Sequence, residues 1–194
     1  MKKIFSALCV VILAAGCSST SIMNSWKAPG ETLTSSEYKK VMIVAYVKDS
    51  KGRKEVEDKL AERNKSFYPS YKDFTTAQLD QDTSKLISQV KAKGYDGVII
   101  MRLVTAKAKT TYVVGGVNPA YNQIFYYNDY YKSGSVATDM DFIIATNVYS
   151  LTKNKLLWSG VTSSTNPKKL DKLVNGIAKA VVEKMKEDKF LVNK

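Results

Sequence analysis

The sequence predicts a single α/β domain with a mixed sheet, and three observations lead to that fold class. Two β-branched, apolar runs, residues 41–47 and 98–104, have the composition of buried parallel strands. Two helical patterns and a short aromatic segment lie between them, in the order typical of an α/β unit. A strand, a turn and a returning strand then precede a long amphipathic helix. We therefore expect a β-α-β-α-β core followed by an antiparallel hairpin and a C-terminal helix.

The first half of the domain is expected to alternate strands and helices. After the first strand, residues 53–65 place apolar side chains on one face of a helix and charges on the other. Residues 67–71 contain a proline among aromatic residues, which favours a short edge strand or turn. A second helix is predicted from about residue 76 or 82 to Lys93. Gly94 ends it, because glycine adopts the left-handed cap without penalty.

The second half is expected to contain the hairpin and the last helix. Residues 135–149 predict a long strand, and residues 156–161 predict the strand that returns beside it. Asn154 lies in the turn between them and is suited to a positive φ. Asn166-Pro167 predicts a helix start, with asparagine as N-cap and proline at the first helical position. Residues 170–185 carry apolar side chains at helical spacing.

The N-terminal residues 1–16 have the organisation of a targeting segment. Two lysines precede an apolar stretch, residues 4–13, that is shorter than the roughly 20 residues needed to cross a bilayer. Ala14-Ala15-Gly16-Cys17 follows and resembles the lipobox of bacterial lipoproteins, although Ala14 stands where leucine is commonest. The alternative is an ordinary secretory signal that is followed by cysteine by chance.

The lipobox resemblance implies that Cys17 is acylated and becomes the N-terminus of a membrane-anchored protein. Residues 17–37 are then expected to form the lipidated terminus and a tether, and residues 38–194 the folded domain. Ser18, in place of an aspartate, favours the outer membrane, with the domain on its periplasmic side. Cys9 leaves with the signal, so the mature domain keeps no thiol for a disulfide.

The chain is basic, with a formal net charge of +12 at pH 7. Its lysines are spread along the whole sequence, which is typical of a solvated surface. A basic surface can also attract anionic lipid, lipopolysaccharide or acidic glycan. The sequence contains no motif that reads DNA or RNA, so we expect no nucleic-acid partner.

The residues available for catalysis are few. The sequence contains no histidine, which excludes Ser-His and Cys-His nucleophile pairs and imidazole metal sites. Ser88 and Lys91 have the S-x-x-K spacing of penicillin-binding enzymes, but the accompanying K-T-G is missing. Asp139 and Asp141 share one face of a predicted strand about 7 Å apart, near the separation of paired glycosidase carboxylates. Acids at a strand start are more often solvated or paired with lysine, so we expect no enzyme, no cofactor and no metal.

A tyrosine-rich loop is expected over residues 115–134, and it is the best candidate for a recognition surface. Its candidate contact residues are Tyr121, Phe125, Tyr126, Tyr127, Tyr130 and Tyr131. Tyrosines give a large contact area with a polar tip at low entropy cost. A loop of this length inside a compact domain is usually functional or disordered. The alternative is a hairpin whose tyrosines only cover the sheet.

Five short motifs resemble a group of uncharacterised bacterial envelope lipoproteins. They are Arg53 to Glu57, Pro69-Ser70-Tyr71, Gly94 to Val98, Leu157 to Gly160, and Asn166-Pro167. The order of elements also looks like the small α/β domain of outer-membrane assembly lipoproteins, such as secretion-channel components and activators of cell-wall synthases. These resemblances imply a fold and a location but no catalytic residue.

The combined expectation is a non-enzymatic accessory lipoprotein that binds a protein partner through the tyrosine-rich loop. The alternative is a module that binds glycan, peptidoglycan or lipid with the same tyrosines and nearby lysines.

Overall fold

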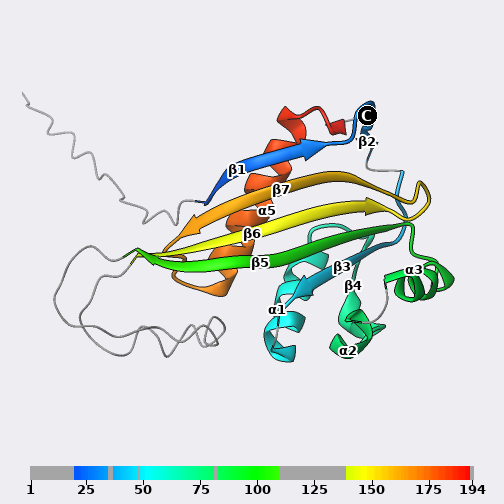
Figure 1. The fold of residues 1–194 in the computed structure, drawn as a ribbon, viewed down its shortest axis with the longest axis horizontal. Helices are drawn as coiled ribbons and strands as arrows, with labels where there is room; N and C mark the ends of the chain where they lie inside the picture. The colour runs from blue at the N-terminus through cyan, green and yellow to red at the C-terminus, as the bar shows by residue number, and fades with distance from the viewer. Residues whose placement is uncertain (1–19, 35–36, 48, 81–82, 110–138, 193–194) are drawn as a thin grey trace, which may run out of the picture.

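The computed structural model of the chain describes residues 20–34, 37–47, 49–80, 83–109 and 139–192 (Figure 1). Six strands form one mixed sheet in the order β1-β7-β6-β5-β3-β4. They are β1 (Thr20–Lys27), β3 (Val41–Tyr46), β4 (Phe67–Pro69), β5 (Gly97–Lys109), β6 (Asp139–Ser150) and β7 (Lys155–Thr165). β3 pairs in parallel with β4 and β5, whereas β5, β6, β7 and β1 pair antiparallel. The predicted α/β mixed sheet is confirmed.

Helices cover both faces of the sheet. They are α1 (Ser50–Ala61), α2 (Thr76–Leu79), α3 (Thr83–Ala92), α5 (Leu170–Glu187) and the 3₁₀ turn η1 (Ser70–Lys72). α1 and α5 pack on one face, and α2 and α3 pack on the other face near β3 and β4 (Figure 1). Two short strands, β2 (Leu33–Thr34) and β8 (Leu191–Val192), form a separate parallel pair that joins the segment after β1 to the C-terminal end of the described fold.

β3 contributes to the hydrophobic core on both faces of the sheet, as its continuous apolar run predicts. Ile43 and Ala45 face the cluster around α1 and α5, whereas Met42 and Val44 face the cluster around α2 and α3. Successive strand side chains point to opposite faces, so such a run stabilises a strand only where helices cover both faces. β3 therefore fixes the three-layer architecture.

The expectation of a tether over residues 17–37 is wrong for its described part. Thr20–Lys27 forms β1, which pairs with β7 at the edge of the sheet. α5 packs closely over the start of β1: a Cβ added to Gly176 would lie 2.4 Å from Thr20 Oγ1. The folded domain thus begins by Thr20, not at residue 38. The edge position of β1 explains why the sequence does not predict a strand there, since β1 is polar and only partly buried.

Asn166 does not cap a helix, contrary to the prediction. α5 begins at Leu170 after Lys169, whose side chain makes no capping hydrogen bond. Asn166 has a φ of 47° and closes the ladder between β6 and β7. Its backbone N–H donates to Met140 O at 3.0 Å, and its Oδ1 accepts from Met140 N at 2.7 Å. Asparagine tolerates a positive φ and forms hydrogen bonds with nearby backbone groups, so it suits both a helix N-cap and a left-handed turn.

Other boundaries shift by smaller amounts. α1 starts at Ser50 because the Asp49 side chain accepts a 2.6 Å hydrogen bond from Gly52 N and caps the helix there. The single helix predicted before Gly94 consists of α2 and α3. The hairpin turn is confirmed, with Asn154 at a φ of 55°.

Trp158 anchors α5 to the sheet. It is fully buried, and its indole N–H donates to Asp188 Oδ2 at 3.0 Å. A Cβ on Gly160 would lie 2.1 Å from Trp158 Cη2, so only glycine leaves room for the indole ring. Burial raises the pKa of Asp188, but hydrogen bonds from Trp158, Lys184 and Ser25 outweigh this effect and hold the pKa below its usual value.

Candidate functional site

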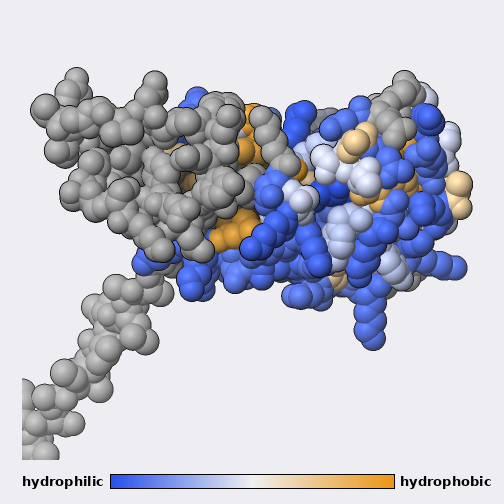
Figure 2. All heavy atoms as spheres, turned by 90° about the horizontal axis from the view of Figure 1, so that it is seen from below, coloured by the Kyte–Doolittle hydropathy of each residue, from blue (hydrophilic) through white to orange (hydrophobic). Residues whose placement is uncertain are grey.

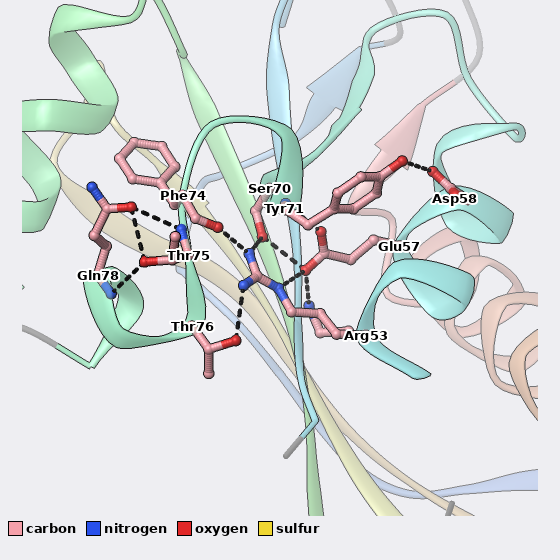
Figure 3. Close-up of polar contacts among 10 residues, drawn as sticks. Arg53, Glu57, Asp58, Ser70, Tyr71, Phe74, Thr75, Thr76 and Gln78 are labelled. Carbon is pink, nitrogen blue, oxygen red and sulfur yellow. Dashed lines mark hydrogen bonds and ion pairs between the residues drawn. The ribbon is translucent and has the colours of Figure 1, made fainter. Parts of the chain in front are cut away.

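Two of the motifs that were noted in the sequence meet in one buried polar network (Figure 3). Arg53 Nε donates to Glu57 Oε1 at 2.9 Å, and the guanidinium also donates to Ser70 Oγ and to the carbonyl of Phe74. Glu57 accepts in addition from Ala45 N at 3.0 Å and from Ser70 Oγ at 2.7 Å. These bonds join α1 to β3 and to the segment after β4.

This network is structural. Arg53 is 3% exposed, and Glu57 and Ser70 are fully buried, so no substrate reaches the Ser70 hydroxyl. A buried ion pair is maintained only where further hydrogen bonds satisfy both groups, as they do here. Arg53 and Glu57 therefore hold α1 in place against β3 and the segment after β4.

The Gly94 to Val98 motif also has a structural role. Gly94 adopts a φ of 78°, and Tyr95 is buried with its hydroxyl donating to Asp73 Oδ2 at 2.7 Å. Burial and this hydrogen bond raise the pKa of Tyr95. Asp96 accepts from the backbone N–H groups of Lys39 and Lys40. The motif thus fixes the turn into β5.

The weak catalytic candidates do not form a catalytic arrangement among the described side chains. Ser88 Oγ donates to the backbone carbonyl of Ser84 at 3.0 Å, and Lys91 Nζ donates to Asn154 Oδ1 at 3.3 Å. Asp141 Oδ1 accepts from Thr165 Oγ1 at 2.5 Å. The Asp139 side chain lies outside the described residues. Within the described ranges, no three His, Cys, Asp or Glu side chains are grouped as metal ligands.

One end of the sheet brings together the points where the two sequence-predicted functional segments join the fold. We call it the distal end. β1 begins there at Thr20, opposite Ser164 of β7, and β5 ends there at Lys109, opposite Asp139 of β6. Thr20, the first described residue after Cys17, lies at this end, as do Lys109 and Asp139, the described residues on either side of the tyrosine-rich segment in the sequence (Figure 1).

At the distal end, part of β5 has no strand partner among the described residues, and an apolar side chain is exposed. β3 pairs with β5 only as far as Arg102, so the rest of β5 has no described partner on that side. The register between β5 and β6 shifts at Val104, which is 50% exposed. Such a bulge increases the local twist of the strand. Unpaired strand edges of this kind are sites at which other chains add.

A small apolar hollow of about 80 Å³ lies beside this edge, between the end of β3 and the start of α5. Its lining includes Val47, Leu103, Phe142 and Leu170. In a view from below the sheet, hydrophobic residues show in separate patches on a mostly hydrophilic surface (Figure 2).

The individual site residues that the sequence predicts cannot be placed. Cys17, Tyr121, Phe125, Tyr126, Tyr127, Tyr130 and Tyr131 all lie outside the described residues, as does the whole loop 115–134. Their roles stay predictions. Among the helices of the described ranges, none combines the length and the apolar character needed to cross a membrane.

Sequence reasoning also gave no sign of a cavity between the sheet, α1 and α5. It has a volume of about 450 Å³ and lies toward the other end of the sheet, where β3 and β5 begin. Its lining residues come from segments far apart in the chain, so no local sequence pattern predicts the cavity.

No protein-family model matches the chain, and no curated protein matches it. Among solved structures, it is similar to the PelC dodecamer from Paraburkholderia phytofirmans, with 10% identity over 84% of this chain and 95% of that chain and a TM-score of 0.47. It is also similar to lipoprotein GNA1162 from Neisseria meningitidis, with 13% identity over 76% of this chain and 98% of that chain and a TM-score of 0.41. These similarities concern the arrangement of helices and strands and carry no functional information. One of these similar structures is that of a lipoprotein.

Proposed function

We propose that the chain is a lipid-anchored protein of the bacterial cell envelope that binds a protein partner without catalysing a reaction. The tyrosine-rich segment is the proposed contact. One observation carries the proposal: the chain from the predicted anchor and both ends of the tyrosine-rich segment join the fold at the distal end of the sheet.

The position of β1 limits how far the domain stands from the bilayer. An extended chain spans at most about 3.3–3.6 Å per residue, so the three residues from Cys17 to Thr20 can span at most about 10 Å. The distal end would then lie next to the membrane surface. A partner that contacts the tyrosine-rich segment is accordingly expected at or in the same membrane.

The open edge of β5 and the adjacent apolar hollow support a protein as the ligand at this end. Backbone groups of an unpaired edge bond to an added strand, and apolar side chains beside it give such an interface its core. The outer membrane, with the domain in the periplasm, is the location we propose from Ser18 and the lipobox resemblance.

The anchor is tested with a Cys17→Ser variant of the full chain. Metabolic labelling with an alkyne-bearing palmitate is expected to mark the wild-type protein and not the variant, because serine offers no thiol for acylation. The matched control is Cys9→Ser, which removes the other cysteine and is expected to keep the label. Equal labelling of wild type and Cys17→Ser would refute the anchor.

Partner binding is tested by crosslinking in living cells. The wild-type lipoprotein is compared with a deletion of residues 117–131 and with the double variant Tyr126→Ala/Tyr127→Ala. Tyr68→Ala is the control, since Tyr68 is 41% exposed on β4, at the opposite edge of the sheet from β1. A discrete protein adduct that is lost in the first two variants and kept in the control supports the proposal. The absence of any protein adduct from the wild type would contradict it.

A further inference from the structure

The cavity between the sheet, α1 and α5 has walls that are almost entirely apolar. Leu60, Ile99, Met101, Ile177 and Val181 are among its lining residues. Small-molecule sites typically occupy about 300–1,000 Å³ and combine apolar walls with a few convergent polar groups. At about 450 Å³, this cavity falls in that range.

Two hydroxyl groups in the wall have no partner. Tyr38 is 9% exposed and Thr146 is 3% exposed, and both line the cavity. Tyr38 OH and Thr146 Oγ1 are buried without a hydrogen-bond partner in the described part of the chain. A buried polar group that stays unpaired destabilises the fold, so native structures rarely contain one. Both hydroxyls belong to residues that line one cavity, so hydrogen-bond acceptors of a ligand that reached them there would supply the missing partners.

The charged residues of the lining are both cations. Arg63 follows the end of α1, Lys186 lies in the last turn of α5, and both residues are exposed. Arg63 also donates a hydrogen bond to Asn175 Oδ1. None of the described residues that line the cavity is Asp or Glu. An apolar ligand with an acidic group would therefore meet complementary charge where the cavity opens.

We propose that this cavity binds a single-chain phospholipid, with one ester-linked acyl chain and a phosphate head. The acyl chain packs against the apolar wall, the oxygens of the ester and glycerol accept from Tyr38 and Thr146, and the phosphate lies near Arg63 and Lys186. The binding is non-covalent. This site does not depend on the proposed partner contact, since it lies toward the end of the sheet where β3 and β5 begin, away from Thr20 and Lys109.

The test is photolabelling of the full chain in phosphatidylcholine vesicles. The probe is a lysophosphatidylglycerol with a C16 acyl chain that carries a diazirine, and the labelled peptides are identified by mass spectrometry. Adducts are expected on the segment of α5 that lines the cavity, Ile177 to Lys186. One hydrogen bond contributes about 0.5–1.5 kcal/mol, so Tyr38→Phe and Thr146→Val are each expected to weaken the probe's affinity about 2- to 10-fold.

Matched variants separate a specific site from general lipid contact. Thr162→Val removes a buried hydroxyl that already bonds the Ile144 carbonyl, outside the cavity, and is expected to leave labelling unchanged. Lys186→Gln is expected to lower the affinity for the probe several-fold. Its control is Lys179→Gln, which removes an exposed charge of the same helix outside the cavity lining.

Competition identifies the head group. Unlabelled lysophosphatidylglycerol is expected to displace the probe at lower concentration than palmitate, and palmitate at lower concentration than the neutral monopalmitoylglycerol. Displacement of the probe by the neutral lipid as effectively as by the phospholipid would overturn the proposal. Labelling that is equal in wild type, Tyr38→Phe and Thr146→Val would overturn it as well. Neither result bears on the crosslinking experiment, which reports on the tyrosine-rich segment.

Discussion

Replacing Thr146 by valine is expected to stabilise the protein when the cavity holds no ligand. Valine keeps the branched shape of threonine and removes the hydroxyl that is buried and unpaired. An unsatisfied buried polar group costs about 1–3 kcal/mol. The free energy of unfolding should therefore rise by that amount. In a chain of about 150–250 residues, 1 kcal/mol corresponds to an increase in Tm of about 2–4 °C.

The assay is urea unfolding of the full chain in phosphatidylcholine vesicles, followed by tryptophan fluorescence. Trp158 is fully buried, whereas Trp26 is 49% exposed, so the signal change on unfolding comes mainly from Trp158. Wild type and Thr146→Val are compared without added single-chain lipid, and the midpoints give the difference in stability.

The control for this prediction is Thr162→Val, which makes the same chemical change on the neighbouring strand β7. Thr162 is fully buried, but its hydroxyl donates to the Ile144 carbonyl at 3.2 Å. Its loss should lower stability by about 0.5–1.5 kcal/mol. If Thr146→Val destabilises the protein as Thr162→Val does, the Thr146 hydroxyl has a partner in the ligand-free protein. The reasoning that leads to a ligand site is then refuted.

Three further predictions concern the residues that hold the fold together. Gly160→Ala should destabilise the protein by about 1–3 kcal/mol or more, because the added Cβ would lie 2.1 Å from Trp158 Cη2. An unchanged urea midpoint would show that the Trp158 ring does not lie against Gly160. The Asp188 carboxylate has a pKa below 3.8 in the folded state, so it stabilises the fold above that pH and loses this effect as the pH falls through the lowered pKa. When the urea midpoint is measured at a series of pH values below 3.8, it should therefore fall less steeply with decreasing pH in Asp188→Asn than in wild type. Parallel curves for the two proteins would contradict this prediction. Glu57→Gln should lower the free energy of unfolding by about 3–5 kcal/mol, because it leaves the buried Arg53 charge uncompensated. The double variant Glu57→Gln/Arg53→Met should lose less stability than the sum of the two single variants. Additive losses would show that the pair is not coupled.

The parts of the fold that could be predicted from the sequence are those with a strong local pattern. β3 and β5 contain continuous apolar runs, and α5 carries its buried residues at helical spacing, so their type and order are evident. The short edge strand β4 was indicated by Pro69, which lacks an N–H for a central strand. In each case the signal lies within a few consecutive residues and does not depend on distant contacts.

The remaining features depend on contacts between distant residues. β1 is polar and becomes a strand only because β7 offers its edge. Asn166 suits both a helix cap and a left-handed turn, and the partner Met140 decides between them. The unpaired hydroxyls of Tyr38 and Thr146 come from opposite parts of the chain. Local sequence patterns cannot reveal whether such groups find a partner.

The pairing of β1 with β7 and of β2 with β8 sets the order in which the domain can assemble. Leu33 pairs with Leu191, so the N-terminal strands find their partners only when nearly the whole described chain is present. Contacts of such high sequence separation form late and slow the folding of a domain. During synthesis, which runs from the N- to the C-terminus, β1 therefore remains without its partner strand until β7 has been made.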